Sequence, residues 1–380
     1  MPPKGLNATE KEKTVEVDVR IVQIVRNWGP VGGMESYVWH LSHALANQHC
    51  LITVICEKAH AKANSERIRI IEIGELRQKP RWLMYWRFAN RVEEQIQALG
   101  LKQDCIIHSH ERSISHDMTT FHAMPFATIK EKTWFKQVSI RVWAYLKMEL
   151  RELGGLPKQS VSIIPVSNSI ARAIQRYYPQ VVNRMHQPIS PGVIPLPQRP
   201  AQSVLQDGGS IGFFGTEWSR KGFAFFIRIA EQLRMRRPHL KVIVLGAEQD
   251  QVAHLCKNYD GDIAFLGWQP SANLYQDLDL LIHPASSEAY GMVIAEAMAC
   301  KVPVVVSEHC GAAVDVSIGH GSVLSLKAPV QDWVNECDRW LNNHTAPIGF
   351  ERPWSKVASE YMVEYERLRL TKNSLKTTKA

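Results

Sequence analysis

The sequence predicts an α/β protein of two domains, each built on a parallel sheet. The chain has 380 residues, 45% of them hydrophobic, which is more than one ordinary domain requires. Short β-branched runs alternate with segments of helical periodicity, a pattern typical of parallel α/β folds. The predicted strands are residues 17–25, 51–56, 105–108, 163–166, 211–214, 241–245, 263–266, 280–283 and 302–306.

Between the strands, residues 34–46, 223–235 and 291–299 carry apolar side chains at i, i+3 and i+4, as helices packed on a sheet do. Five prolines between residues 188 and 200, followed by Asp207-Gly208-Gly209, exclude a helix or a central strand there. We expect the interdomain linker in this segment, between domains at 1–195 and 205–345. Residues 353–370 predict a final packed helix, with a frayed polar tail at 371–380.

Composition limits the class of protein. No apolar run approaches the ~18 residues of a membrane span, and residues 1–13 lack the apolar core of a secretory signal, so we expect a cytoplasmic protein. Seven cysteines without a C-x-x-C pair fit buried thiols. The net charge of +8 suits an anionic partner, which could be nucleic acid, a membrane surface or a phosphorylated substrate. Nucleic acid is not expected, because no zinc-finger, zipper or RNP-like motif is present.

Two acids flank a glycine-initiated helix after the predicted strand 280–283. Glu288 falls in the loop at the carboxyl end of that strand, and Glu296 falls within the helix. Gly291 allows a ligand to approach N–H groups at the helix N-terminus, a position that suits a diphosphate. The plainer interpretation is that both are ordinary helical acids. The surrounding small and apolar residues argue against it for Glu296, because a buried acid requires donors such as ribose hydroxyls.

A pair of cations, Arg220 and Lys221, follows the predicted strand 211–214. Such a pair beside a strand end can hold a diphosphate and stabilise a leaving nucleotide as negative charge develops on it. Considered alone, a solvated Arg-Lys pair is the more common explanation. In the first domain, Gly32 and Gly33 follow the first strand and allow a tight turn whose N–H groups face a cleft, although the turn does not spell G-x-G-x-x-G.

Histidines cluster at His108, His110, His116 and His122. Their spacing gives no convincing set of zinc ligands, so we expect structural hydrogen bonds and no metal or cofactor. Asp277-Leu278-Asp279 leads into an apolar strand and is interpreted as structural.

These motifs resemble the family 4 retaining glycosyltransferases. The stretch from Glu288 to Ala299 resembles their E-x-F-G-x-V-x-x-E-A-M-A pattern, with Tyr290 where Phe is usual, and Arg220-Lys221-Gly222 resembles their R-K-G motif. The resemblance implies the GT-B fold, in which two Rossmann-like domains face each other across a cleft and residues 346–380 carry a helix that crosses back to the first domain. The form of these motifs is most similar to bacterial lipopolysaccharide core glucosyltransferases.

The resemblance also implies roles for residues. Glu288, Lys221 and His122 are expected at the reacting centre, with His122 facing the donor sugar. Donor-binding residues are expected to be Gly32, Gly33, Arg220, Lys221, Gly291, Met292, Val293 and Glu296. The implied reaction transfers a glucose-like hexose, with retention, from a UDP-linked donor to a glycan or glycolipid acceptor such as lipopolysaccharide core. A nucleotide-sugar 2-epimerase and a non-catalytic nucleotide-sugar-binding subunit are the alternatives.

Two stretches interleave cations with large aromatic residues, at 79–88 and at 134–147. This composition suits an anionic lipid surface and, with the net charge, predicts peripheral association with the inner face of the cytoplasmic membrane. A helix that packs its apolar face on the core and exposes its basic side chains to solvent explains each stretch equally well.

Overall fold

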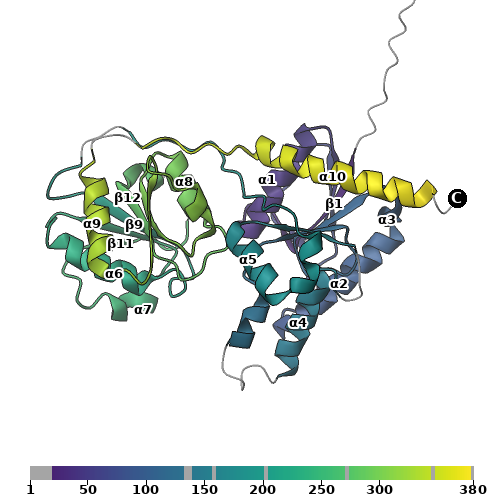
Figure 1. Ribbon diagram of the computed structural model, residues 1–380, viewed down its shortest axis with the longest axis horizontal. Coiled ribbons are helices and arrows are strands. Elements are labelled where there is room, and N and C mark those ends of the chain that lie inside the picture. The colour runs from purple at the N-terminus through teal and green to yellow at the C-terminus, as the bar shows by residue number, and fades with distance from the viewer. Residues whose placement is uncertain are drawn as a thin grey trace, which may run out of the picture.

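The computed structural model describes residues 19–131, 139–155, 160–200, 204–269, 274–343 and 347–377. Two lobes stand side by side, and each contains a six-stranded sheet between helices (Figure 1). The neighbouring strands of both sheets pair in parallel. The mixed α/β class and the two Rossmann-like halves predicted from the sequence are therefore confirmed.

The first sheet has the order β5-β3-β1-β6-β7-β8. Its strands are β1 (Arg20–Ile24), β3 (Leu51–Cys56), β5 (Ile68–Glu72), β6 (Ile106–Ser109), β7 (Met118–Phe121) and β8 (Ser162–Pro165). The helices of this lobe are α1 (Gly33–Asn47), α2 (Arg81–Ala98), α3 (Leu101–Asp104), α4 (Ile140–Glu152) and α5 (Asn168–Tyr177), and a two-residue pair, β2 (Asn27–Trp28) and β4 (Lys58–Ala59), lies outside the main sheet.

The second sheet repeats this topology as β11-β10-β9-β12-β13-β14. Its strands are β9 (Ser210–Phe214), β10 (Lys241–Leu245), β11 (Ile263–Phe265), β12 (Leu280–His283), β13 (Val304–Ser307) and β14 (Gly321–Leu324), with α6 (Phe223–Arg234), α7 (Gln249–Val252), α8 (Met292–Ala299) and α9 (Val330–Leu341) around it. In both sheets the strand order reverses at the first strand, because the next two strands lie on one side of it and the last three lie on the other. Ligands of doubly wound sheets bind in the crevice at this reversal, outside the carboxyl ends of the strands.

The nine predicted strands correspond to β1, β3, β6 and β8 to β13, with ends shifted by a few residues. β5, β7 and β14 of the two main sheets were missed, as were the two-residue strands β2 and β4. The described residues between Arg184 and Ser210 contain neither helix nor strand, as the prolines predict. We propose 1–195, 205–345 and 346–380 as the domain bounds.

The last helix, α10 (Trp354–Thr377), lies across the first lobe beside α1 (Figure 1). The prediction that the chain frays from residue 371 is wrong, because the helix continues to Thr377. Lys372 explains the extension, since its Nζ donates to Asp117 Oδ2 at 2.6 Å and to the carbonyl of Cys105 at 2.9 Å. The described part of the chain thus runs from the first lobe to the second and returns to the first.

The seven cysteines are thiols, six of them buried, and none forms a disulfide within the described residues. Asp279 is structural, because it accepts hydrogen bonds from the Ser210 N–H at 2.8 Å and pairs with Arg199. Within the described ranges, no helix combines the length and apolar character needed to cross a bilayer.

Candidate functional site

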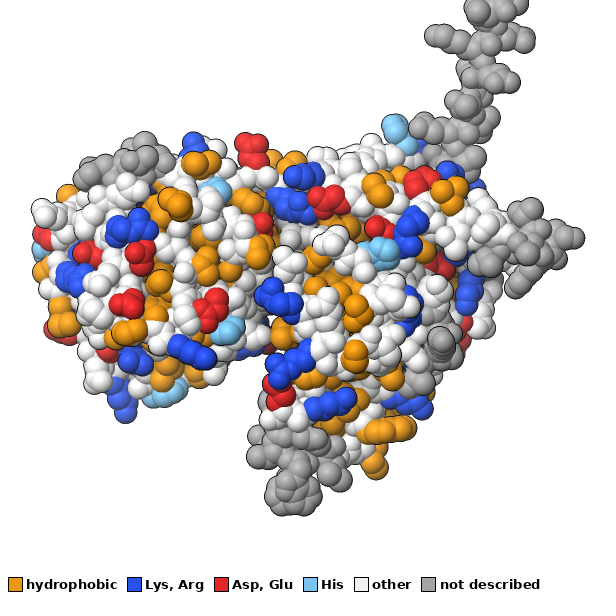
Figure 2. Space-filling view, in the orientation of Figure 1, with side chains coloured by type: hydrophobic (Ala, Val, Ile, Leu, Met, Phe, Trp, Pro, Cys, Tyr) orange, Lys and Arg blue, Asp and Glu red, His pale blue; other side chains and the backbone are white. Residues whose placement is uncertain are grey.

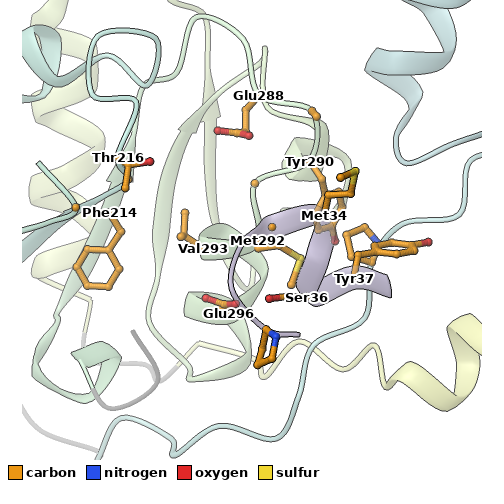
Figure 3. Close-up of a pocket in the computed structure, with 18 of the residues that line it drawn as sticks. Met34, Ser36, Tyr37, Phe214, Thr216, Glu288, Tyr290, Met292, Val293 and Glu296 are labelled. Atoms are coloured by element: carbon orange, nitrogen blue, oxygen red, sulfur yellow. The ribbon is translucent and has the colours of Figure 1, made fainter. Parts of the chain in front are cut away.

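A cavity of about 770 Å³ lies between the two lobes. Nine of the sequence-predicted site residues line it: Gly32, Gly33, His122, Lys221, Glu288, Gly291, Met292, Val293 and Glu296. In Figure 3, Met34, Ser36 and Tyr37 approach from α1 on one side, and Phe214 and Thr216 lie on the other, with Glu288 and Glu296 between them. The structure therefore gathers residues from both domains around one space, at the carboxyl ends of β9 and β12.

The two acids lie on either side of the N-terminus of α8. Gly291 is the N-cap of this helix and has φ +100°, a left-handed conformation that favours glycine. No described side chain caps the helix. Because the first N–H groups of a helix lack partners within it and carry its positive dipole end, the segment of Gly291, Met292 and Val293 is suited to bind an anion.

Lys221 reaches the cavity past a glycine. Gly215 directly follows β9 and has φ +155°, and a Cβ there would overlap Cδ of Lys221. Gly222 follows with φ +82°, and a Cβ at that position would overlap the carbonyl oxygen of Pro284. These two glycines allow the segment between them, which contains Lys221, to lie directly against the loop after β12. As a result Lys221 Nζ is 3.2 Å from Glu288 Oε2.

Glu288 is a deeply set carboxylate with 12% of its side chain exposed. His283 Nε2 lies 3.6 Å from its Oε2, and an Arg220 nitrogen lies at 3.5 Å. Burial alone would raise the pKa of Glu288, but His283 and the two cations Lys221 and Arg220 lower it to about 2. The carboxylate is therefore ionised at neutral pH and is a weak base.

Arg220 itself is not among the residues that line the cavity. Its guanidinium donates to the carbonyl of Ser287 and pairs with Glu217. In this structure Arg220 thus braces the loop of Glu288 rather than facing the space that a ligand would fill.

Glu296 is half-buried, one turn into α8. The hydroxyl of Tyr275 donates to its Oε2 at 2.6 Å. This hydrogen bond fixes a carboxylate at the wall of the cavity, where it can accept further hydrogen bonds from a ligand with hydroxyl groups.

On the first domain, Gly32 is the N-cap of α1 and has extended backbone, and Gly33 opens the helix. His122 follows β7, and its Nε2 lies 2.8 Å from Nδ1 of the buried His110. Burial lowers the pKa of His122 to about 3, so the imidazole is neutral. The Tyr37 ring packs edge to face with this imidazole, with 4.8 Å between the ring centroids.

The other histidines form hydrogen bonds to protein groups. His108 bonds Thr120 and Tyr365, and His116 bonds Ser113 and the carbonyl of Glu152. Within the described parts of the chain, no group of three or more His, Cys, Asp or Glu side chains is arranged to hold a metal ion.

Sequence reasoning missed several residues at this site. Tyr37, Thr216, Trp268 and Gln269 line the cavity. His283 is fully buried beside Glu288, with neither ring nitrogen hydrogen-bonded to a described residue. A polar residue that ends a fully apolar strand was a usable signal for His283, but no pattern in the sequence pointed to the other four.

Comparison with known proteins agrees with this geometry. Residues 31–193 match the family model for Glycosyltransferase Family 4, and residues 208–343 match the model for Glycosyl transferases group 1. A D-inositol 3-phosphate glycosyltransferase of Mycobacterium leprae is 29% identical over 161 residues, which are 39% of this chain and 37% of that enzyme. The match thus spans well under half of that relative's length.

Solved structures share the fold over most of both chains. WaaG, a glycosyltransferase involved in lipopolysaccharide biosynthesis, superposes with a TM-score of 0.70 at 15% identity, over 90% of this chain and 94% of that one. Anabaena HepE in complex with UDP and glucose gives a TM-score of 0.59 at 15% identity, over 95% and 99%. With both domains matched by glycosyltransferase models and the fold shared throughout, the chain belongs to the family 4 glycosyltransferases with the GT-B fold.

Proposed function

We propose that this protein is an active glycosyltransferase that transfers a glucose-like hexose from a UDP-linked donor to a glycan acceptor. The observation that supports this most directly is the grouping of Lys221, Glu288 and the N-terminus of α8 around one interdomain cavity. A cation and a helix N-terminus together match a diphosphate, and acids beside them match hydroxyl groups. The donor-binding and catalytic roles given above are part of this proposal, except that Arg220 acts through the loop of Glu288 rather than on the donor.

The charges on the two walls favour one orientation of the donor. The second domain offers Lys221 and the α8 N-terminus to the diphosphate, and Glu296 offers an acceptor to the ribose. The first domain offers the neutral ring of His122, which suits sugar hydroxyls and does not attract phosphates. Lys221 would then stabilise the nucleoside diphosphate as it leaves.

We propose that transfer occurs with retention. The acceptor hydroxyl attacks the anomeric carbon from the face that the diphosphate leaves, the bond from that carbon to the diphosphate oxygen breaks, and a leaving-group oxygen takes the proton. The state of Glu288 supports this route. A carboxylate whose pKa is about 2 and which is ion-paired with Lys221 is a poor general base.

For the acceptor, we propose an anionic glycan such as lipopolysaccharide core. Three guanidinium groups surround the ring of Tyr85 on α2: those of Arg26, Arg81 and Arg112 lie 5.5, 5.8 and 5.2 Å from its centroid. Arg26 follows β1 and Arg112 follows β6, so two of the three stand at the reversal point of the first sheet. The fold shared with WaaG, which is involved in lipopolysaccharide biosynthesis, is consistent with this acceptor.

Such an acceptor would be reached at a membrane surface, and α4 offers a basic and apolar face for it. Ile140 is 79% exposed and Trp143 64%, beside the exposed Arg141 and Lys147. Figure 2 shows hydrophobic and basic side chains together at the end of the lobe where Figure 1 places α4. Residues 134–136 of the same predicted stretch lie outside the described residues. We therefore propose peripheral association with the inner face of the cytoplasmic membrane.

The decisive assay mixes the protein with UDP-glucose and a purified lipopolysaccharide core acceptor, and follows the anomeric proton of the product by NMR. We expect an α-linked product from the α-linked donor. An inverted product would reject the mechanism. Loss of donor without an acceptor, with release of a rearranged or hydrolysed sugar, would favour the epimerase. Nucleotide binding without any turnover would favour the non-catalytic subunit.

Membrane association is tested by sedimentation with vesicles of phosphatidylglycerol and phosphatidylethanolamine. We expect binding that is lost when Trp143→Ser and Ile140→Ser are combined. Binding should be kept in the control Ile318→Ser, which changes an even more exposed isoleucine on the other domain. Absence of binding by the wild-type protein would reject the proposal.

A further inference from the structure

A continuous chain of hydrogen bonds, buried except where it meets the cavity, runs from His122 to the last helix and back. Its eight contacts join residues of strands β1, β6 and β7, of the loops that follow β6 and β7, of helices α1 and α10, and of the segment after α5. In order, the groups are His122, His110, Gln23, Tyr365, His108, Thr120, Tyr361, Tyr37 and the carbonyl of Ile189, with successive distances of 2.8, 2.7, 3.3, 2.6, 2.7, 2.7, 2.8 and 3.3 Å.

The last member of the chain fixes the direction of all the others. A carbonyl oxygen can only accept, so the Tyr37 hydroxyl donates to Ile189. Tyr37 has one proton, and Tyr361 must therefore donate to Tyr37. By the same rule Thr120 donates to Tyr361, and His108 Nε2–H donates to Thr120.

The direction continues to the cavity because the histidines are neutral. Burial, with the neighbouring histidines, holds the pKa values of His108 and His110 well below their usual range. With its proton on Nε2, His108 accepts from the Tyr365 hydroxyl at Nδ1, and Tyr365 accepts from the amide of Gln23. The amide oxygen of Gln23 then accepts from His110 Nε2–H, which leaves His110 Nδ1 to accept from His122 Nε2–H.

We propose that this chain fixes the tautomer of His122, with the proton on Nε2 and a bare Nδ1, and that Tyr361 and Tyr365 of the returning helix are positioning residues for the sugar side of the cavity. Nδ1 of His122 forms no hydrogen bond with the described residues, so it remains an acceptor for a ligand. An acceptor nitrogen pairs with a hydroxyl and not with a phosphate or carboxylate oxygen. The hydroxyls of Tyr361 and Tyr365 on α10 therefore favour binding of a ligand hydroxyl at His122.

The reverse direction is the competing state, and it costs one hydrogen bond in the intact protein. If every donor turned around and the Gln23 amide flipped, each contact would survive except that of Tyr37 with Ile189. In Tyr361→Phe the balance changes. The forward direction would leave the buried Thr120 hydroxyl without an acceptor, whereas the reverse direction satisfies it through His108 Nε2. Loss of one hydroxyl on α10 is thus expected to move the proton of His122 to Nδ1.

The test is NMR of protein labelled with ¹⁵N at histidine, without ligand, in which the His122 signals are assigned by their loss in His122→Gln. We expect a protonated Nε2 in the wild type and a protonated Nδ1 in Tyr361→Phe. Thr120→Val is a second variant on a different element. It removes the acceptor of His108 Nε2–H and should give the same reversal. Tyr178→Phe, a buried tyrosine of the same domain that bonds Glu149 instead, should leave His122 unchanged.

A proton on Nδ1 in the wild type would overturn the proposal, and so would an Nε2–H that persists in both Tyr361→Phe and Thr120→Val. The consequence for activity rests on the proposed function and is measured separately. Tyr361→Phe should lower kcat/KM for transfer about tenfold, the effect of one hydrogen bond, while the affinity for UDP stays unchanged. Failure of UDP to bind the wild type would count against the proposed function and would leave the tautomer result intact.

Discussion

Replacing Lys221 by alanine is the change expected to affect transfer most. Its Nζ lies 3.2 Å from Glu288 and its side chain is 14% exposed, so the charge acts where water is largely excluded. A charge-assisted hydrogen bond in such a place contributes about 1.5–3 kcal/mol. If that contact forms with the leaving diphosphate, its loss lowers kcat/KM by roughly ten- to a hundredfold.

Removing Lys221 also changes its neighbour. Glu288 loses the cation closest to it, so the pKa of the buried carboxyl rises from about 2. The loss in kcat/KM should therefore exceed the loss in ground-state donor affinity, since both the stabilisation of the leaving group and the field around Glu288 are altered.

The assay measures initial rates of transfer from UDP-glucose, with Lys241→Ala as the matched control. Lys241 is an exposed lysine on β10 of the same domain. We expect the control to behave as the wild type. An unchanged kcat/KM in Lys221→Ala would refute the assignment of the diphosphate to this wall of the cavity.

Three further predictions use other features of the site and its surroundings. Gly215→Ala keeps every charge but adds a Cβ that would overlap Cδ of Lys221, at a residue whose φ is +155°. The rate of transfer should therefore fall as in Lys221→Ala, and a variant as active as the wild type would contradict the packing argument. Glu296→Gln should weaken UDP binding measured by calorimetry by about 1 kcal/mol or more, whereas Glu231→Gln on α6 should not, and equal affinities would remove Glu296 from the ribose site. Burial raises the pKa of Glu152 from 4.5 to about 8, so between these pH values the folded protein holds a proton that the unfolded chain releases. The contribution of this group to the free energy of unfolding is therefore complete below pH 4.5 and declines as the pH rises toward 8. In urea unfolding, the free energy of unfolding of Glu152→Gln should decline less steeply over that pH range than that of the wild type. The control Glu94→Gln, on the exposed face of α2, should match the wild type. An unaltered slope in Glu152→Gln would contradict the prediction.

Much of the fold could be predicted because its central strands are short runs of apolar, mostly β-branched residues. β3, β10 and β12 were predicted with their bounds as found. The missed strands lack that signal. β7 contains two threonines, and β14 begins with a glycine beside a serine. β5 lies at the edge of its sheet, and its isoleucines are interrupted by an arginine and followed by a glutamate.

The donor wall of the cavity could be predicted for a local reason. Glu288, Gly291 and Glu296 lie within nine residues of one another, so strand, turn and helix position them together. The hydrogen-bond chain behind His122 could not be predicted in this way. Gln23 and Tyr365 are 342 positions apart, and His108 and Tyr365 are 257 apart. Their contact depends on the return of α10 to the first domain, which no local pattern specifies.

The central claim is that the interdomain cavity binds a nucleoside diphosphate through Lys221, and thermal unfolding with UDP, GDP, ADP and CMP tests it most directly. A nucleotide at about a hundred times its Kd stabilises the folded state by ~2.7 kcal/mol and raises Tm by a few degrees. We predict that UDP raises Tm of the wild type, that the other nucleotides do so much less, and that most of the shift is lost in Lys221→Ala and kept in Lys241→Ala. If none of the four nucleotides shifts Tm, or if UDP shifts Lys221→Ala as much as the wild type, the account of this site is contradicted.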